Sequence, residues 1–385
     1  MAIKGRLIKK YFEALDAQNK KGIPFKKKII VQNLMLKSFL SKAKTTKFGK
    51  HYKFDELLKT KDTAKAFSEK VPIFNYESIY QQWWERAVNG EKNICWPGTV
   101  NYMALTSGTS LGATKRIPVT EEMIKSIRKT GFKHLCTIAD YKLPSSFFEK
   151  DILALGGSIM LKEFAAVKEG DLSGILTANL PKWLGNIYLP GNDIAKERDW
   201  NQKIAKIIAK AHEWDVGIIA GVPSWVLSMI QQIIAHYNLK TIHDIWPNFK
   251  VYAHGGVSID PYCSSFEKVL KNKVYFSETY LASEGFFAYQ NVEDGGMHLA
   301  IKSGVYYEFL PFNNDNFDQE GDVVNSLGVV NIEKVKEGIE YALLVTTCSG
   351  AWRYLIGDTI KIIDKETLEI QITGRTKHFV NLCGE

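Results

Sequence analysis

Residues 216–237 read VGIIAGVPSWVLSMIQQIIAHY. The first five residues form a short apolar run, and the Gly-Val-Pro-Ser that follows interrupts it. From Trp225 to Tyr237, apolar side chains recur at helical spacing. A strand, a break and a helix in this order form the unit from which parallel sheets are built, with helices on both faces. We therefore predict an α/β fold.

The same alternation of strand and helix extends over residues 150–280. It predicts several further elements, and together they favour mostly parallel sheets flanked by helices. The predicted strands are Asp151–Leu155, Val216–Ala220, Phe249–Ala253 and Val274–Ser277, and the predicted helices are 200–212, Trp225–Tyr237 and Pro261–Leu270.

The two ends of the chain have a different pattern of predicted secondary structure. The beginning predicts helices, the second of them near residues 28–44. After about residue 297, short strands follow one another with no long helix between them, which predicts a small antiparallel β subdomain. We expect one large domain over 1–373, made of a helical start (1–50), an α/β part (51–297) and a β-rich subdomain (298–373), followed by a hinge-like segment (374–385).

The composition is that of an ordinary globular protein. The chain has 385 residues, of which 45% are hydrophobic and 24% charged, and this excludes a disordered chain. No apolar stretch approaches the roughly 18 residues of a membrane-spanning helix, so we expect no integral membrane segment. The five cysteines are odd in number and widely spaced. This pattern predicts a reducing cytoplasm and no structural zinc.

The positive charge is concentrated at the N-terminus. The net charge is +8, and residues 1–28 hold nine Lys or Arg and two acids, a local net charge of +7. The rest of the chain is nearly neutral, so no basic face indicates a nucleic-acid partner. The first helix is amphipathic and basic, and it could rest on a membrane surface. We favour a helix that packs on its own domain.

A loop rich in glycine and hydroxyl side chains covers residues 105–118, LTSGTSLGATKRIP. Its glycines allow main-chain N–H groups to approach a ligand closely, and its hydroxyl side chains and the Lys-Arg pair add donors. This is the chemistry of a phosphate cradle. It is not a Walker loop, because only three residues separate Gly108 from Gly112 and Ala113 stands where that motif has lysine. A polar surface turn is the alternative.

The pattern Thr-Ser-Gly-Thr-Ser-x-Gly-x-x-Lys resembles the phosphate loop of the acyl-adenylate-forming (ANL) enzymes. More narrowly, the chain resembles the plant auxin-responsive acyl acid amido synthetase family and its bacterial relatives. The segments Thr46–Tyr52, Val71–Glu77 and Gly90–Ile94 resemble that family too. The resemblance implies that the phosphates of ATP are held by Lys115 and by Thr106, Ser107, Gly108, Thr109 and Ser110.

The segment Tyr280–Gly285 follows a predicted strand. It therefore places an aromatic ring, a hydroxyl and a carboxylate at the end of a strand, where ligands sit on an open parallel sheet. It resembles the second signature of the family. The resemblance implies that Tyr280 stacks on adenine, Ser283 contacts the α-phosphate, and Glu284 helps to hold Mg²⁺. A buried strand end with a solvated Glu is the alternative.

Two further motifs occur in the order of the family. The segment His254–Ser258 follows a strand, and the resemblance implies that Gly255, Gly256 and Val257 line the adenine, although a simple turn explains Gly-Gly equally well. The segment Trp352–Asp358 resembles the third signature. The resemblance implies that Asp358 accepts hydrogen bonds from the ribose hydroxyls and that Arg375 also reaches the ribose.

The resemblance implies an ATP-dependent ligase that adenylates a carboxylic acid and passes the acyl group to an amine, such as an amino acid. Lys115, Ser283 and Glu284 would carry the catalysis, with ATP and Mg²⁺ bound. An acyl pocket must be apolar with one open end. Val222, Trp225 and Phe286 are candidates to line it, and ordinary core is as good an interpretation of each.

Three alternatives stay open. The chain could be a thioester-forming ligase of the acyl-CoA type, a nucleotide-binding protein without turnover, or a protein that associates with membrane or nucleic acid through its basic N-terminus. Family members continue with a smaller C-terminal domain, whereas this sequence stops at Glu385. We therefore expect that domain to be missing, with adenylation slowed and amide formation slower or lost. The acid, the acceptor and the oligomeric state are not predicted.

Overall fold

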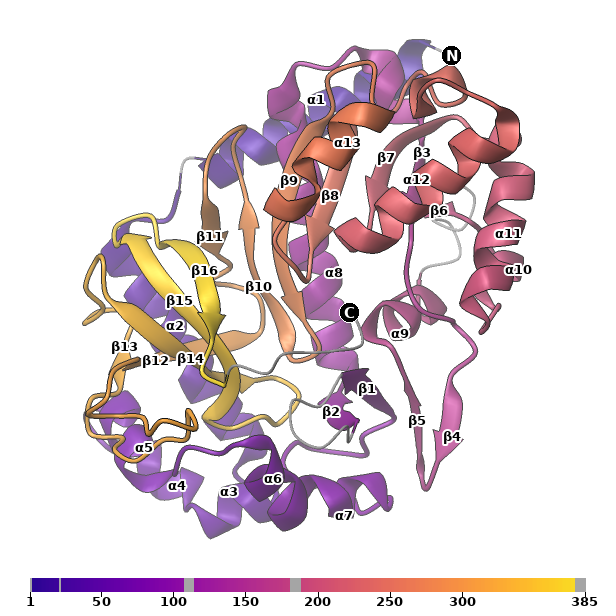
Figure 1. Ribbon diagram of the computed structural model, residues 1–385. Coiled ribbons are helices and arrows are strands. Elements are labelled where there is room, and N and C mark those ends of the chain that lie inside the picture. Colours follow the sequence, from indigo (N-terminus) through magenta and orange to yellow (C-terminus); the bar gives the residue numbers. More distant parts are fainter. Residues whose placement is uncertain (1, 21, 107–113, 181–187, 378–385) are drawn as a thin grey trace.

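The computed structural model describes residues 2–20, 22–106, 114–180 and 188–377 (Figure 1). Its longer helices are α1 (Ala2–Lys20), α2 (Phe25–Ala43), α5 (Thr63–Lys70), α8 (Glu121–Cys136), α11 (Trp200–Lys210) and α12 (Pro223–Tyr237). The shorter ones are α3 (Lys47–His51), α4 (Phe54–Leu57), α6 (Tyr76–Ile79), α7 (Glu85–Val88), α9 (Leu172–Ala178), α10 (Asn192–Ala195) and α13 (Cys263–Val269). Within the described residues, no helix combines the length and the apolar composition needed to cross a bilayer.

Most strands belong to a sheet of twelve, in the order β13-β12-β14-β15-β16-β11-β10-β9-β8-β7-β3-β6. Its parallel part consists of β3 (Asp151–Ala154), β6 (Tyr188–Leu189), β7 (Val216–Ala220), β8 (Val251–Gly255) and β9 (Tyr275–Ala282). Its antiparallel part consists of β10 (Gly285–Gln290), β11 (Met297–Leu299), β12 (Val305–Pro311), β13 (Val330–Asn331), β14 (Glu340–Thr347), β15 (Tyr354–Asp364) and β16 (Glu369–Arg375). Strand β9 joins the parts, because it pairs in parallel with β8 and antiparallel with β10.

A second sheet of four strands lies beside the first. Its order is β2-β1-β5-β4, with bounds β1 (Tyr102–Thr106), β2 (Lys115–Val119), β4 (Lys162–Phe164) and β5 (Val167–Gly170). The pair β1–β2 is antiparallel, whereas β1 and β5 run in parallel. This small sheet carries both flanks of the predicted phosphate loop.

The predicted α/β class is confirmed, and several element bounds agree closely. The strand predicted at Val216–Ala220 is β7 to the residue, and the helix predicted near 28–44 is α2. Strand β9, predicted to end at Ser277, continues to Ala282 because it has a hydrogen-bonded partner on each side. The predicted antiparallel strands are present, and they continue the parallel sheet as one sheet of twelve strands.

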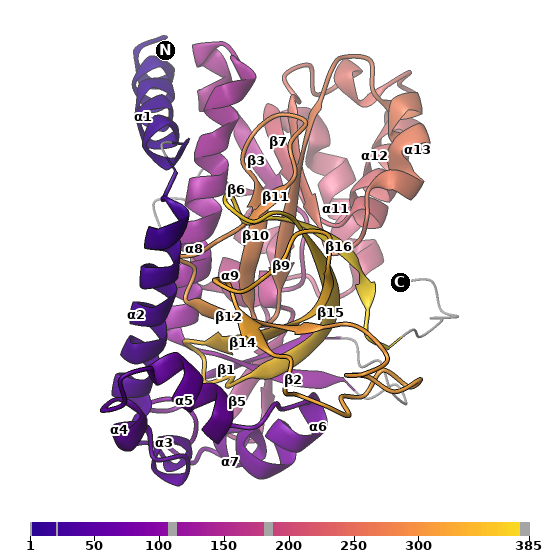
Figure 2. The same ribbon diagram turned by 90° about the vertical axis from the view of Figure 1, so that its left-hand side faces the viewer.

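Helices cover both faces of the long sheet. Figure 2 shows α1, α2 and α8 on one side and α11, α12 and α13 on the other. Helix α1 packs on its own domain, as we predicted: the Gly5 amide donates a hydrogen bond of 2.6 Å to Glu149, and the ring of Phe12 meets those of Phe132 and Phe148 edge-on.

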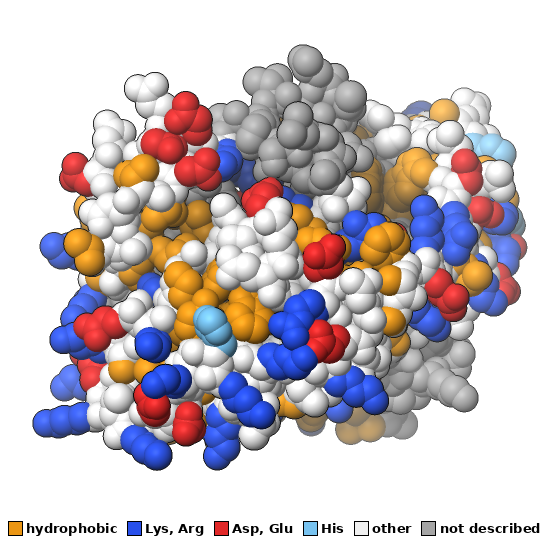
Figure 3. Space-filling model, turned by 90° about the horizontal axis from the view of Figure 1, so that it is seen from below, with side chains coloured by type: hydrophobic (Ala, Val, Ile, Leu, Met, Phe, Trp, Pro, Cys, Tyr) orange, Lys and Arg blue, Asp and Glu red, His pale blue; other side chains and the backbone are white. Residues whose placement is uncertain are grey.

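Helices α3 to α7 gather at one end of the molecule around a cluster of aromatic rings. Phe48 lies at its centre, 5.6 Å from the ring of Trp352 and 4.9 Å from that of Trp83. Figure 3 views the molecule from this end, where apolar side chains come to the surface between Lys and Arg side chains. The cluster fastens the N-terminal helices to the segment that precedes β15.

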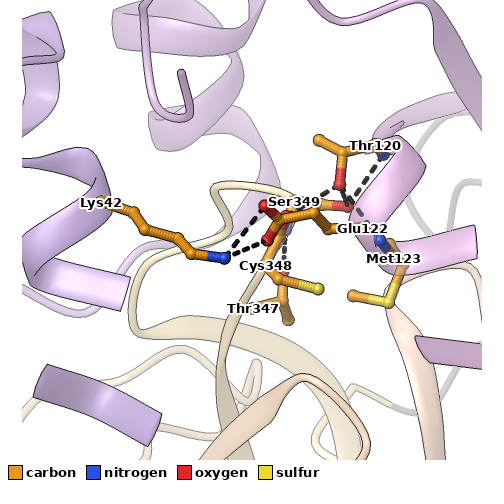
Figure 4. A network of polar contacts seen from close by, with 7 residues as sticks. All are labelled: Lys42, Thr120, Glu122, Met123, Thr347, Cys348 and Ser349. Atoms are coloured by element: carbon orange, nitrogen blue, oxygen red, sulfur yellow. Dashed lines mark hydrogen bonds and ion pairs between the residues drawn. The ribbon is translucent and has the colours of Figure 1, made fainter. Parts of the chain in front are cut away.

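Polar contacts tie helix α8 to the same part of the sheet (Figure 4). Thr120 caps the helix, and its hydroxyl also donates a 2.8 Å hydrogen bond to the Cys348 carbonyl. Lys42 of α2 pairs with Glu122 at 3.0 Å. Because β2 ends one residue before Thr120, these contacts also hold the strand that begins with Lys115.

A buried ion pair holds the N-terminal helices to the antiparallel strands. Arg353 and Glu308 are both almost fully buried, with the guanidinium Nε 3.1 Å from each carboxylate oxygen. The same guanidinium donates hydrogen bonds to the carbonyls of Ser68 and Val71. Arg353 lies within the segment Trp352–Asp358 but serves packing, since it satisfies these buried acceptors.

We expect the substitution Glu308→Gln to lower the free energy of unfolding by about 3 kcal/mol, because it leaves a buried guanidinium without its counter-charge. Chemical denaturation measures this change. The control is Glu69→Gln in α5, where the pair with Lys65 is exposed and 3.9 Å long; this change should cost less than about 1 kcal/mol. Equal effects would show that the carbonyl contacts alone hold Arg353.

Candidate active site

The hairpin β1–β2 brings Lys115 back to the start of the predicted phosphate loop. Thr106, the last residue of β1, is paired directly with Lys115, the first residue of β2. Burial lowers the pKa of Lys115, while Glu77 and Glu284 oppose that change. The remaining predicted loop residues, Ser107, Gly108, Thr109 and Ser110, lie outside the described residues. The pairing of β1 with β2 explains why Thr106 and Lys115, nine positions apart in the sequence, lie side by side.

The turn between β9 and β10 carries Ser283 and Glu284. Ala282 and Gly285 are paired, so Ser283 and Glu284 between them form a tight hairpin turn at the end of the two strands. Glu284 is only 8% exposed. Burial raises the pKa of its carboxyl to about 7, with Asp358 adding to the rise and Lys115 and Arg375 opposing it. Such a carboxyl lies close to the balance between its neutral and ionised forms at neutral pH.

Asp358 and Arg375 face each other on paired strands. They are opposite residues in the β15–β16 ladder, and Arg375 Nε lies 3.1 Å from Asp358 Oδ1. The other carboxylate oxygen accepts a 2.6 Å hydrogen bond from the Tyr280 hydroxyl. Burial raises the pKa of Asp358, and Arg375 opposes it. Tyr280 is thus linked to the predicted ribose site through its hydroxyl, while its ring packs edge-on against Phe287.

The Gly255-Gly256 pair ends strand β8 beside β9. A Cβ on Gly255 would lie 2.3 Å from the Thr279 carbonyl oxygen, and Gly256 has a φ of +85°, so both positions require glycine. Val257 follows with a side chain that is 41% exposed. The glycine at 255 lets β8 lie close to Thr279 of β9, and Gly255, Gly256 and Val257 all line the large cavity.

These groups line one large cavity of about 3480 Å³. It opens at the carboxyl ends of β7, β8 and β9, where ligands bind in open α/β sheets. Every predicted site residue that the structure describes lines it, namely Thr106, Lys115, Val222, Trp225, Gly255, Gly256, Val257, Tyr280, Ser283, Glu284, Phe286, Asp358 and Arg375. The folded chain thus brings together residues spread over 270 positions of sequence.

The three predicted acyl-pocket residues lie on opposite sides of the sheet. Trp225 of α12 packs 4.8 Å from the ring of Trp200, whereas Phe286 of β10 lies near the ring of His134 on α8. Val222 precedes α12 at the cavity wall. We conclude that α8 and α12 each contribute an apolar wall.

Two histidines also line this cavity. His254 belongs to a motif singled out in the sequence, whereas the sequence did not place His134 at the site. His134 lies inside α8 with its Nε2 2.8 Å from the Ser277 hydroxyl, and His254 lies at the end of β8. Burial lowers the pKa of each to about 4, so both are neutral at pH 7. His134 and Ser277 are 143 positions apart in the sequence, and no local motif predicts their contact. Among the described residues, no group of three or more His, Cys, Asp or Glu side chains is suited to a metal ion.

Comparison with known proteins identifies the family. Residues 25–203 match the GH3 family N-terminal domain, and residues 298–375 match the GH3 family central domain. The chain belongs to the GH3 family. This confirms the family of acyl acid amido synthetases expected from the motifs, within the adenylate-forming superfamily. The two matches include the β1–β2 hairpin that flanks the predicted phosphate loop and the Asp358–Arg375 pair of this GH3 protein.

Its relatives are distant in sequence. Indole-3-acetic acid-amido synthetase GH3.4 from Arabidopsis thaliana is 22% identical over 86% of this chain and 64% of its own length. Indole-3-acetic acid-amido synthetase GH3.2 from the same plant is 21% identical over 86% of this chain and 71% of its own length. This chain thus spans roughly two thirds of the length of these relatives.

Solved structures share the fold. GH3.15 acyl acid amido synthetase superposes with a TM-score of 0.71 at 18% identity, covering 90% of this chain and 68% of that one. A 2-hydroxyisobutyryl-CoA ligase, solved in complex with 2-HIB-AMP and CoA, has a TM-score of 0.56 at 12% identity, covering 89% of this chain and 73% of that one. The fold of this GH3 protein is therefore shared by amide-forming and thioester-forming ligases.

We expect Glu284→Gln to stabilise the protein at high pH and not at low pH. The pKa of Glu284 is raised from 4.5 to about 7 by folding. The contribution of Glu284 to the stability of the wild type is therefore fully present below pH 4.5, and it is lost as the pH rises through 7. The difference in unfolding free energy between variant and wild type should grow by about 3 kcal/mol from pH 5 to pH 8.

Urea denaturation at several pH values, without nucleotide or divalent cation, measures that difference. Glu69→Gln serves as the control, since its carboxyl is exposed. A difference for Glu284→Gln that stays constant from pH 5 to pH 8 would contradict the raised pKa.

Proposed function

We propose that this GH3 protein activates a carboxylic acid with ATP, as an acyl-adenylate, and transfers the acyl group to the amine of an amino acid. The observation that carries the proposal is the convergence of Lys115, Glu284, Asp358 and Arg375 at one end of a cavity with apolar walls. The names of the curated relatives support it, because they describe the formation of amides from indole-3-acetic acid.

The first step needs no protein nucleophile. A carboxylate oxygen of the substrate attacks the α-phosphorus of ATP, the bond between that phosphorus and the bridging oxygen breaks, and pyrophosphate leaves. In the second step, the amine nitrogen attacks the acyl carbon, AMP leaves, and the nitrogen loses a proton. The protein therefore has to align the reactants and neutralise the charge that develops on phosphate.

Each described residue has a distinct task in this scheme. Lys115, held at the start of β2, supplies positive charge to the phosphates. Asp358, oriented by Arg375 and by the Tyr280 hydroxyl, accepts hydrogen bonds from the ribose. Gly255 and Gly256 line the cavity and would lie beside the base. The chain around Tyr280 thus holds sugar and base, while the β1–β2 hairpin holds the triphosphate.

The donor set fits a magnesium ion bound together with ATP. Glu284 offers a carboxylate inside the cavity, and Mg²⁺ is commonly held by one or two carboxylates plus phosphate oxygens. Glu284 would be its protein ligand, and the ion would supply neutralisation of phosphate charge. The carboxyl must be ionised to bind a cation, which its raised pKa makes dependent on pH.

The acceptor decides between an amide and a thioester. The GH3 relatives favour the amide, and the likeness to the CoA ligase concerns the fold alone. Thermal-shift screening with ATP, Mg²⁺ and a panel of carboxylic acids would first find the acid. Mass spectrometry of reactions that contain that acid, with amino acids or with CoA, then identifies the product.

A cytoplasmic location is part of the proposal and accords with the free thiols of Cys95, Cys136, Cys263 and Cys348.

We expect Asp358→Ala to weaken ATP binding by about 100-fold, because two charge-assisted hydrogen bonds to the ribose disappear. Calorimetric titration with ATP and Mg²⁺ measures the affinity, and circular dichroism confirms that the variant is folded. The control is Asp193→Ala in α10, whose side chain is exposed. Unchanged affinity in Asp358→Ala would remove the ribose assignment.

A further inference from the structure

Helices α1 and α2 expose apolar side chains along one edge of the molecule. On α1, Leu7 is 64% exposed and Tyr11 56%, and on α2, Ile30 is 56% exposed and Leu34 60%. The members of each pair are four positions apart, so they are neighbours on one face of their helix. Figure 2 shows the two helices one below the other along the same edge. A single exposed apolar residue is ordinary in a globular protein, whereas two such pairs on consecutive helices indicate a contact surface.

Lysines surround the apolar pair of α2. This helix contains five lysines and no acidic residue. Lys26 and Lys27 lie four and three positions before Ile30, and Lys37 lies three positions after Leu34, so all three are neighbours of the pair. They are exposed, and within the ranges that the structure describes none of them forms an ion pair. Helix α2 therefore presents an apolar strip between positive charges.

A second group of lysines lies beside α2. The Ile301 carbonyl accepts a 3.0 Å hydrogen bond from the Gln32 side chain of α2, which places the next residue, Lys302, near that helix. Burial lowers the pKa of Lys133 of α8, and the positive charges of Lys129 and Lys302 lower it further. Among the described residues, no carboxylate pairs with any of these three lysines, so an anionic partner would relieve their repulsion.

The two features together fit the surface of an anionic membrane. Phosphate-bearing head groups attract lysines, and the adjoining acyl region accepts apolar side chains. A nucleic acid offers phosphates but no apolar layer in which Ile30 and Leu34 could be buried. A second copy of this chain would bring the same lysines against each other, and like charges at an interface oppose association.

We propose that this protein docks on membranes that contain anionic phospholipids. The docking surface, which we call the basic face, consists of the exposed side chains of α1, those of residues 26–37 in α2, and the group of lysines around Lys133. Its lysines contact the head groups, and its apolar side chains insert among them. Because Tyr11 of α1 also lines the large cavity, docking holds one wall of that cavity at the membrane. The inference is independent of the proposed function.

Co-sedimentation of the full chain with vesicles tests the charges of the basic face. Vesicles of phosphatidylcholine alone are compared with vesicles of phosphatidylcholine and phosphatidylglycerol. We expect the wild type to bind the anionic vesicles more tightly by about tenfold or more. Lys26→Glu combined with Lys37→Glu should weaken that binding by about 25-fold or more, because each lysine near an anionic surface contributes about fivefold.

The matched control for these charges lies on the other side of the sheet. Lys240 follows α12 and Lys268 belongs to α13, and both are exposed. Lys240→Glu combined with Lys268→Glu changes the net charge by the same amount and should leave binding nearly unchanged, because salt screens charges that are remote from the membrane.

The apolar side chains are tested separately. Ile30→Ser combined with Leu34→Ser keeps the charge and should weaken binding to the anionic vesicles by about tenfold, because less apolar surface inserts. The control is Val324→Ser combined with Leu327→Ser, which changes two exposed apolar residues in the segment before β13 and should leave binding unchanged. Thermal unfolding shows whether each variant is folded.

Four results would overturn the inference. The wild type could bind neither kind of vesicle, or both equally. The serine variant on α2 could keep full binding, which would show adsorption by charge without insertion. A DNA duplex could bind more tightly and displace the vesicles, which would assign the basic face to nucleic acid. Sedimentation velocity could show a dimer that the serine variant dissociates, which would assign this face to a second copy of the chain.

Discussion

Strand β9 carries the constraint on which the site depends. It must pair in parallel with β8 and antiparallel with β10, so the chain turns back at Ser283 and Glu284, at the edge where the parallel strands end. Backbone hydrogen bonding on both sides leaves the strand no freedom to slip, because a shift of one residue would move every side chain to the opposite face. Tyr280 and Glu284 therefore both lie in the lining of the cavity.

The antiparallel half supplies the other charges by the same means. Asp358 and Arg375 are brought within 3.1 Å because β15 and β16 pair in one register. The segment that precedes β15 is anchored by Arg353 to Glu308 and to two carbonyls of the N-terminal helices. Packing of buried residues behind the cavity lining thus supports the strand that carries Asp358, which we propose for ribose binding.

The cavity holds buried carboxyl groups close to cationic side chains. Glu284 and Asp358 are carboxyl groups whose pKa burial raises, and Lys115 and Arg375 are the cations that oppose this rise. Burial of acids near a few cations destabilises the empty protein. The same arrangement is suited to a ligand that brings phosphates, a cation and ribose hydroxyls, since these would satisfy the groups that the protein alone leaves poorly balanced.

The sequence by itself determined the α/β class and most strands and helices, because local periodicity and turn residues carry that information. The motifs that we propose for nucleotide binding were found by their resemblance to a known family. Only the tertiary structure decided that the parallel and antiparallel strands form a single sheet and that Phe286 lies across the sheet from Trp225. It also decided that His254 is paired with Glu278 across β8 and β9 and that His134 contacts Ser277. These contacts join residues far apart in the chain. They follow from strand register and burial, which no local pattern of residues encodes.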